Sequence, residues 1–530
     1  MILVRRLRLA VGEDIAALKA RAAKRLGIRE ADIAEYTLVK RSLDARRKDD
    51  IHYICSLAVR LKCDERRILA RARAAKAEPY TPSEYVIPPA PEGCDRPVIV
   101  GFGPAGMFAA LVLSRAGARP IVIERGRDAV SRRATVEAFR AGGALDTECN
   151  VQFGEGGAGT FSDGKLNTGT HDKRMFWVLR QFHEHGASES VLYDAKPHIG
   201  TDVLIDIVQN IRADVIAHGG EVRFQTRLDG LVVESGRLVG ARVTGSDGEY
   251  TLPCSRLILA VGHSARDTFE MLHAQGVNMQ PKPFSMGVRI EHKQNAINAA
   301  QYGAGYALDL GAADYSLNVH LPDGTSAYTF CMCPGGEVFA AASETGGVVT
   351  NGMSYSARDG ENANSALLVT LTPEDFPYPG ALGGMYWQRD IERAAYRVGG
   401  GNYLAPAQTV GDFLAKRPST GDAGVRPTYR PGVVWCELRE VLPERITAVL
   451  ENAIPALGGK LAGFDAPEAV MTAPETRSSS PVRIVRDAAL QGSIPGLYPC
   501  GEGAGYAGGI SSAAVDGMRC AEAVLRDMTE

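Results

Sequence analysis

The sequence predicts an α/β fold: a discontinuous Rossmann-like domain with an inserted α+β domain, preceded by a small β-α-β-β domain. A glycine turn lies between an apolar strand and a helix near residue 100, and a strand, a glycine loop and a helix return at the end of the chain. The segment between them is rich in Gly, Tyr and Ser and breaks this rhythm. At 530 residues the chain exceeds the size of one hydrophobic core. We expect three domains, over residues 1–92, over 93–280 joined with 476–530, and over 281–475.

The first domain is predicted from short periodic segments. Residues 1–10 form a β-rich run, and apolar positions from Ile15 to Leu26 recur at helical spacing. A hairpin follows over residues 36–61, where two β-rich runs flank a charged turn. The proline-rich stretch from Tyr80 to Pro97 reads as a semi-rigid linker, because proline continues neither a helix nor a central strand.

Charge is distributed unevenly along the chain. The formal net charge is −3, yet residues 1–80 hold 20 Lys and Arg against 11 Asp and Glu. Such asymmetry can mark a surface for nucleic acid or another acidic partner, although more often it is a solvated face. Both interpretations stay open for the first domain.

Composition argues against several other classes of protein. No apolar run approaches the roughly 20 residues that span a bilayer, and the N-terminus lacks the apolar core of a signal peptide. We therefore expect a cytoplasmic protein without membrane contact. The ten cysteines form no Cys-x-x-Cys pair, which argues against a disulfide framework or a metal site. One close pair, Cys331 and Cys333, could do redox work if both thiols shared a strand face, or could be two small buried side chains.

The glycine turn carries the strongest functional signal. Gly101 allows a tight turn, Gly103 lets the backbone approach a pyrophosphate, and Gly106 permits close helix–strand packing. The helix that follows offers free N–H groups and a positive dipole end. Glu124 ends the next strand, where a carboxylate can accept both ribose hydroxyls and would repel a 2′-phosphate. The predicted dinucleotide contacts here are Gly101, Gly103, Pro104, Ala105, Gly106, Glu124 and Arg125.

Two further glycine runs are weaker signals. Residues 159–165 imitate a phosphate-binding P-loop, but Leu166 stands where a Mg²⁺-binding Ser or Thr is needed, so we do not expect an ATPase. Residues 154–159 match the dinucleotide spacing without a preceding strand or an acidic partner. We expect them to form a loop that wraps the cofactor, with Gly156 and Gly157 in contact with it.

Several stretches resemble one known family. They are Gly154 to Gly169, Pro283 to His292, Thr329 to Gly336, Asn351 to Arg358, Ser478 to Ile484 and Tyr498 to Gly517. Through them nearly the whole chain resembles an uncharacterised family of bacterial FAD-dependent dehydrogenases, relatives of the glutathione-reductase-type flavoproteins. The resemblance implies that FAD is the cofactor, that the discontinuous domain binds it, and that the inserted domain faces the substrate.

The resemblance also implies further cofactor contacts. Gly501 and Glu502 would contact the ribityl-phosphate chain, and Gly508, Gly509 and Ile510 would bring N–H groups to the pyrimidine edge of the flavin. Many relatives carry Asp where this chain has Glu502. Gly262 ends a strand-to-glycine turn of the kind found near the adenine.

Few residues are diagnostic of the reaction, because a flavin performs most of the chemistry itself. Lys165 is the candidate for polarising flavin or substrate, or else a structural lysine. Arg477 and Arg483 could clamp a substrate carboxylate or phosphate, or could pair across a domain interface. His263 could act as an acid or base, or be structural.

The predicted function is an FAD-dependent oxidoreductase, a dehydrogenase or reductase that transfers a hydride between flavin and a small organic substrate. Electrons could come from transient NAD(P)H or from a protein, since a second full dinucleotide fingerprint is absent. The alternatives are a flavoprotein that acts on RNA through its basic first domain, and a flavin-binding regulator without catalysis.

Overall fold

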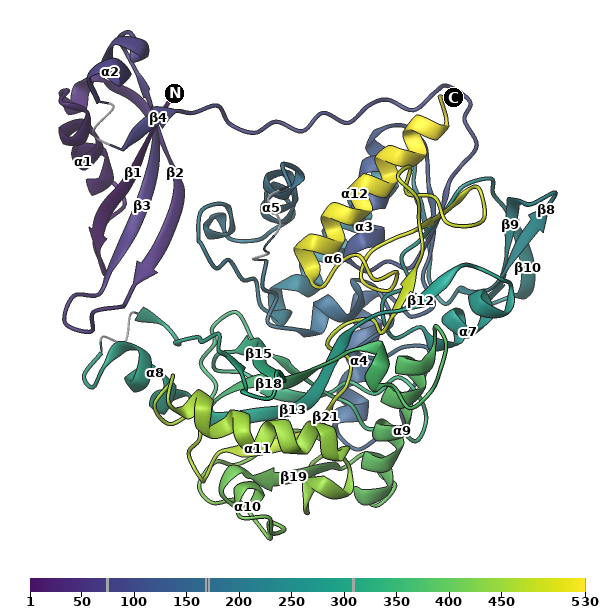
Figure 1. Cartoon of the computed structure of the whole chain (residues 1–530). Helices are drawn as coiled ribbons and strands as arrows, with labels where there is room; N and C mark the ends of the chain where they lie inside the picture. Colours follow the sequence, from purple (N-terminus) through teal and green to yellow (C-terminus); the bar gives the residue numbers. More distant parts are fainter. Residues whose placement is uncertain (73–75, 167–168, 170–171, 307–309, 530) are drawn as a thin grey trace.

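A computed structural model describes the protein over residues 1–72, 76–166, 169, 172–306 and 310–529. Asn167 and Thr168, which belong to one of the family-like stretches, lie outside the described residues. Figure 1 shows a small N-terminal unit set apart from a larger body and joined to it by an extended segment. Among the described helices, none combines the length and apolarity needed to cross a membrane.

The N-terminal unit contains the predicted elements and two more. Its strands form one antiparallel sheet in the order β2-β3-β1-β4. The buried side of α1 supplies Leu18, Ala22 and Leu26 to a core shared with the sheet, as its spacing predicts. The extra elements are α2 and β4, and α2 is a charged helix whose apolar Ile68 and Leu69 pack against the core of the unit. The bounds are β1 (Ile2–Ala10), α1 (Ala17–Leu26), β2 (Ile33–Asp44), β3 (His52–Leu61), α2 (Glu65–Ala72) and β4 (Ala77–Pro79).

The linker, Arg41 of β2 and apolar side chains at the tip of the β2–β3 hairpin join this unit to the body. Tyr85 of the linker donates a hydrogen bond to Glu522 over 2.9 Å. Arg41 of β2 forms a bidentate pair with Asp194, at 2.7 and 3.0 Å. The same guanidinium lies 5.1 Å from the ring centroid of Tyr193, and the backbone of Arg41 donates to Tyr193 over 2.7 Å and accepts from Ala195 over 2.9 Å.

The central domain is built on a parallel sheet in the order β23-β11-β5-β6-β7. Its three inner strands and the edge strand β23 are buried at every position, as is usual when helices cover both faces of a parallel sheet. Strand β23 comes from the end of the chain, so the fold is discontinuous in sequence. The bounds are β5 (Val98–Val100), α3 (Pro104–Arg115), β6 (Ile121–Ile123), β7 (Glu221–Arg223), β11 (Leu257–Leu259), β23 (Leu497–Pro499) and α12 (Ile510–Asp527).

Other elements surround this sheet. Helices α3 and α12 lie side by side in Figure 1, and a Cβ on Gly517 would lie only 2.0 Å from the carbonyl oxygen of Ala105, so their backbones touch. A three-stranded meander, in the order β10-β9-β8, projects from the domain. The bounds are α4 (Ala129–Arg140), α5 (Arg174–Glu184), α6 (Thr201–Ala217), β8 (Arg227–Glu234), β9 (Arg237–Gly245), β10 (Gly248–Pro253) and α7 (Arg266–Ala274).

The insertion forms a second, mostly antiparallel sheet in the order β14-β15-β18-β13-β21-β19-β20. Strands β13 and β18 pair along their whole length and are buried at nearly every position. The strand bounds are β13 (Phe284–Lys293), β14 (Asn318–His320), β15 (Ser326–Cys333), β18 (Asn362–Leu371), β19 (Ala405–Thr409), β20 (Val433–Trp435) and β21 (Val470–Glu475). The helix bounds are α8 (Gln294–Tyr302), α9 (Gly383–Val398), α10 (Val410–Leu414) and α11 (Glu444–Gly458).

Two short ladders complete the body. Strands β12 (Met279–Pro281) and β22 (Val482–Ile484) pair where the chain leaves the central domain and where it returns. This pairing holds the two crossings side by side. A hairpin of β16 (Glu337–Ala340) and β17 (Thr350–Met353) lies between the two large domains and contributes to a small apolar cluster with Phe161.

Candidate functional site

A cavity of about 440 Å³ lies between the central domain and the insertion. Its volume is in the range of pockets that hold small molecules. The glycine turn after β5 and the turn after β11 line one part, at the carboxyl ends of parallel strands, where open α/β sheets bind ligands. The insertion lines the other part with Tyr315, Thr329, Phe330, Asn351 and Glu475.

Two helices begin at this cavity. The N-cap of α3 is Gly103 and that of α12 is Gly509, and no side chain among the described residues caps either helix. Both glycines line the cavity, with Gly508 and Ile510 beside the second. The first N–H groups of both helices are therefore free to bind a ligand, and both positive dipole ends favour negative charge there.

The glycine turn cannot be built from larger residues. Gly101 has φ +96°, and a Cβ there would lie 2.4 Å from the carbonyl oxygen of Ala260. A Cβ on Gly106 would lie 1.9 Å from the carbonyl oxygen of Gly101. Gly101 lines the cavity together with Pro104 and Ala105, whereas Gly106 lies behind the wall and allows α3 to pack against the turn.

Glu124 ties three backbone segments together at one end of the cavity. One carboxylate oxygen accepts the N–H of Phe102 over 2.8 Å, and the other accepts the N–H groups of Gly126 and Gly154, each over 2.9 Å. The side chain lines the cavity although the residue is only 5% exposed. The predicted ribose contact therefore falls on a carboxylate that also organises the glycine turn.

Arg125 lines the same end of the cavity. Its guanidinium pairs with Glu148 at 3.0 Å and with Asp267 at 2.9 Å, and it lies 4.2 Å from the ring centroid of Phe153. These contacts fix its position. Arg125 is held as part of the wall by two carboxylates and one ring.

In the loop over residues 154–159, only one of the two predicted cofactor contacts, Gly156 and Gly157, lines the cavity. Gly157 lines the cavity, and a Cβ there would lie 2.9 Å from the Cα of Gly103. Gly156 lies behind the wall, where its N–H donates to the carbonyl of Phe102 over 2.9 Å. Gly157 is thus the glycine that can face a cofactor, while Gly156 holds the loop to the turn.

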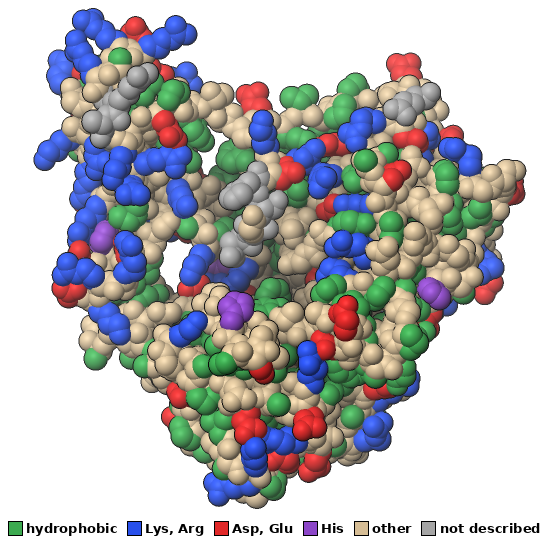
Figure 2. All heavy atoms as spheres, in the orientation of Figure 1, with side chains coloured by type: hydrophobic (Ala, Val, Ile, Leu, Met, Phe, Trp, Pro, Cys, Tyr) green, Lys and Arg blue, Asp and Glu red, His purple; other side chains and the backbone are tan. Residues whose placement is uncertain are grey.

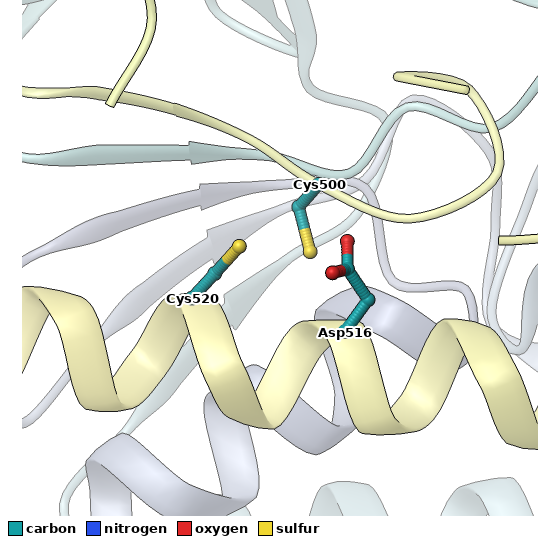
Figure 3. A group of neighbouring side chains, drawn as sticks. All are labelled: Cys500, Asp516 and Cys520. Atoms are coloured by element: carbon teal, nitrogen blue, oxygen red, sulfur yellow. The ribbon is translucent and has the colours of Figure 1, made fainter. Parts of the chain in front are cut away.

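The C-terminal loop is anchored from α12. Figure 3 shows Asp516 and Cys520 on the helix, with Cys500 on the loop above them. Asp516 accepts the N–H of Gly501 over 2.8 Å and pairs with Arg486 at 2.6 Å. Burial raises the pKa of the Cys500 thiol well above its usual range. Because the arginine already neutralises the carboxylate and the thiol stays protonated, this group does not suit a metal ion and instead anchors the loop.

The residues at the turns after β23 and β11 differ in whether they line the cavity and in whether they can be charged. Gly501 lies behind the wall, and Glu502 lines the cavity, where burial raises the pKa of its carboxyl to about 7. Gly262 and His263 also line the cavity. Burial lowers the pKa of His263 to about 3, so its imidazole is neutral near pH 7, and its Nδ1 lies 2.9 Å from the hydroxyl of Ser264.

Lys165 lies where the central domain meets the insertion. Its ammonium donates to the carbonyl of Met332, and its Nζ lies 4.0 Å from a carboxylate oxygen of Asp163. Asp163 in turn pairs with Arg358 of the insertion. Lys165 lines the cavity, as do all three of these neighbours, so a positive charge lies on the wall between the two domains.

The two arginines predicted as a clamp do not lie together. Arg477 lines the cavity but is 7% exposed and donates to Glu392 of α9 over 2.9 and 3.0 Å. The same carboxylate accepts two bonds of 2.8 Å from Arg266 of α7, so Arg477 is part of a domain-interface pairing. Arg483 is exposed and lies away from the cavity, over the ring of Tyr506, because β22 turns it outward. A two-arginine clamp is therefore not formed.

Glu475 is a residue that the sequence analysis missed. It ends β21, is 4% exposed and lines the cavity. Burial raises the pKa of its carboxyl to about 7, while Arg289, 3.4 Å away, lowers it. The signal in the sequence was a carboxylate at the end of the otherwise uncharged run from Val470 to Glu475.

Comparison with known families gives three matches along the chain. A family described as an FAD binding domain matches residues 96–266. A family described as the C-terminal domain of FAD-dependent proteins matches residues 283–478. A domain of unknown function matches residues 1–60. The donor set of the cavity fits FAD, because two free helix N-termini and a carboxylate suit a pyrophosphate, a polar ring edge and a ribose.

Individual relatives give little about the reaction. Aklavinone 12-hydroxylase RdmE of Streptomyces purpurascens is 30% identical over 177 residues, which is 31% of this chain and 32% of that protein. The solved structure of the flavin-dependent brominase Bmp2 gives a TM-score of 0.37 at 12% identity, with 82% of this chain and 79% of that chain covered. An uncharacterised protein of Clostridium beijerinckii is 46% identical over 531 residues, which is 99% of this chain and 98% of that protein. The chain therefore belongs to the family of FAD-dependent proteins that includes this clostridial protein.

Proposed function

We propose that the protein is an FAD-dependent oxidoreductase, a dehydrogenase or reductase that transfers a hydride between its flavin and a small organic substrate. One observation carries the proposal: the free N-termini of α3 and α12 open into a single cavity that also reaches the insertion. A cofactor held by both helices would present its ring to the side chains of the second domain.

The chain's own residues would hold the cofactor in a defined direction. The N-terminus of α3 behind Gly103 suits the pyrophosphate, and Glu124 suits the ribose of the adenosine. The N-terminus of α12 at Ile510 suits the pyrimidine edge, where its positive end stabilises negative charge. When bound, FAD supplies the two-electron hydride chemistry.

The insertion would bind and protonate the substrate. Hydride transfer to or from an organic molecule is accompanied by a proton, and a group whose pKa lies near the working pH moves it most efficiently. Glu475 is such a group on the cavity wall, whereas the imidazole of His263 is neutral and held by Ser264. Lys165 would attract an anionic substrate group.

The test is the visible spectrum of the purified protein under anaerobic NADH or NADPH. A tightly bound flavin that bleaches rapidly supports a reductase driven by a nicotinamide. A bound flavin that bleaches only with an organic reductant supports a dehydrogenase. A flavin that stays oxidised with every small-molecule reductant contradicts the proposal and favours a regulator, and no flavin after reconstitution contradicts FAD binding itself.

A flavoprotein that acts on RNA is the second candidate. Figure 2 shows Lys and Arg side chains gathered over the N-terminal unit and facing the gap beside the body. Exposed examples are Lys40, Lys62, Arg66 and Arg67. Contacts to phosphates weaken steeply with salt, so binding of tRNA that falls with salt and disappears on deletion of residues 1–92 would favour it. Binding unchanged by the deletion would end it.

A further inference from the structure

A pair of cysteines lies on the insertion's side of the cavity. Cys331 lines the cavity and is half-buried, while Cys333 is buried beside it. Both are free thiols. A regular strand would carry them on one face, but β15 has a bulge between Phe330 and Cys333, and Cys331 takes the left-handed φ of +41°. The bulge brings Cys331 to the cavity and leaves Cys333 underneath.

Arg289 joins the two cysteines to a carboxyl. Its side chain is fully buried on β13, and its Nη2 donates to the carbonyl of Cys331 over 2.7 Å and to the Sγ of Cys333 over 3.4 Å. Its Nη1 lies 3.4 Å from Glu475, and burial favours the neutral form of that carboxyl. A buried guanidinium needs a counter-charge, and the long contact to Glu475 supplies only part of it.

The Cys331 thiol can supply the missing negative charge. The neighbouring Cys333 thiol and the charges of Arg289 and Lys165 lower its pKa, against the opposing effect of burial. The Cys333 Sγ itself donates to the carbonyl of Cys331 over 3.2 Å. Burial keeps the Cys333 thiol protonated by raising its pKa. One thiolate beside one thiol is the arrangement that disulfide formation needs, and it does not fit two inert apolar side chains.

The pair also lies at the flavin end of the cavity. Cys331 and Glu502, in the loop that leads into α12, line the same cavity. Burial raises the pKa of Glu502, and the charge of the Cys331 thiol adds to the rise. The start of α12 is where the proposed function places the pyrimidine edge of the ring.

We propose that Cys331 and Cys333 form a redox-active thiol pair that exchanges two electrons with the flavin, an inference that rests on the proposed function. In the oxidising direction a bond forms between the two Sγ atoms and the S–H bond of Cys333 breaks. Two electrons and that proton pass to the oxidised isoalloxazine ring, whose two-electron reduced form carries one added proton. The reverse step opens the disulfide with two electrons and one proton. A thiol or disulfide is then the substrate class that reaches Cys331.

Electron uptake tests the pair. Oxidised holoprotein is titrated anaerobically with dithionite, and the visible spectrum gives the flavin content of the same sample. We expect the wild type to take up about twice as many electrons per flavin as Cys331→Ser or Cys333→Ala, because each two-electron couple adds one equivalent. Cys254→Ser, which changes a buried free thiol outside the cavity lining, is the control and should match the wild type.

Each other outcome is decisive. If the wild type binds flavin but takes up only the two electrons that the flavin itself accepts, the redox role of the cysteine pair is refuted and the proposed function still stands. Loss of uptake in Cys254→Ser alone overturns that role as well. If no flavin binds, the proposed function fails, and diamide oxidation with peptide mapping decides the pair separately: a Cys331–Cys333 disulfide supports it, and unlinked cysteines refute it. Two variants at the pair keep the test valid if one fails to fold.

Discussion

The two sides of the cavity are built differently. The adenosine end of the cofactor side takes its contacts from Gly101 to Glu124, within one βαβ unit, where neighbours in sequence are neighbours in space. The substrate side brings together Lys165, Cys331 and Glu475, which lie far apart in sequence and meet because the insertion folds back onto the central domain. Local chemistry can therefore be recognised in a sequence, whereas long-range placement depends on the packing of two domains.

The largest expected effect is a difference in stability between variants of Arg477 and Arg483, the two arginines that the sequence analysis grouped as a clamp. Arg477→Ala removes a partner of the buried Glu392, which is 1% exposed, and should lower the free energy of unfolding by about 3–5 kcal/mol. Arg483→Ala changes an exposed side chain and should cost about 0.5 kcal/mol or less. Calorimetric melts of the two variants measure the difference. Equal losses would show that Arg477 does not hold the domain interface.

The glycine turn tests the cofactor side. Gly101→Ala introduces a Cβ at 2.4 Å from a carbonyl oxygen, whereas Gly117→Ala introduces one into open space at a similar positive φ, +88°. The control should therefore carry only the left-handed strain, about 1 kcal/mol. The overpacked turn should cost about 3 kcal/mol and abolish FAD binding, as fluorescence titration would show. A Gly101→Ala variant that retains FAD would contradict the geometry of the turn.

The sequence predicts the parts of the site that depend on local contacts and misses those that depend on contacts between distant segments. The glycine turn, the strands beside it and the return of β23 follow from local periodicity and turn chemistry. The three N–H groups on Glu124 come from loops that the sequence does not show to be neighbours. Arg477 and Arg483 looked equivalent by residue type, and only β22 turns one of them outward. Likewise, the bulge at Cys331 depends on pairing with β18, a strand 30 residues further on.

Glu124→Gln tests whether the carboxylate that organises the glycine turn also binds the ribose of FAD. In the wild type, backbone N–H groups donate to both carboxylate oxygens of Glu124. The amide of Gln has the same shape but only one acceptor oxygen, so at least one N–H group would face the NH₂ group instead. We expect a loss of about 2 kcal/mol in FAD affinity, roughly thirtyfold in Kd. Glu148→Gln is the control, because this half-buried carboxylate does not line the cavity and pairs with Arg125 and Arg227 in the described part of the chain. Unchanged FAD affinity in Glu124→Gln would place the ribose elsewhere.

The smallest expected effect is a pH dependence on the substrate side. The pKa of Glu475 is about 7 in the folded chain and about 4.5 when unfolded, so between these values the folded state binds the extra proton. Stability from this group is therefore present at pH 5 and is lost as pH rises through 7, by about 1 kcal/mol between pH 6 and pH 7. Glu475→Gln removes this loss, since its amide stays neutral. The wild type should become less stable than the variant as pH rises from 5 to 8, and parallel melting curves for the two proteins would mean that the carboxyl ionises normally.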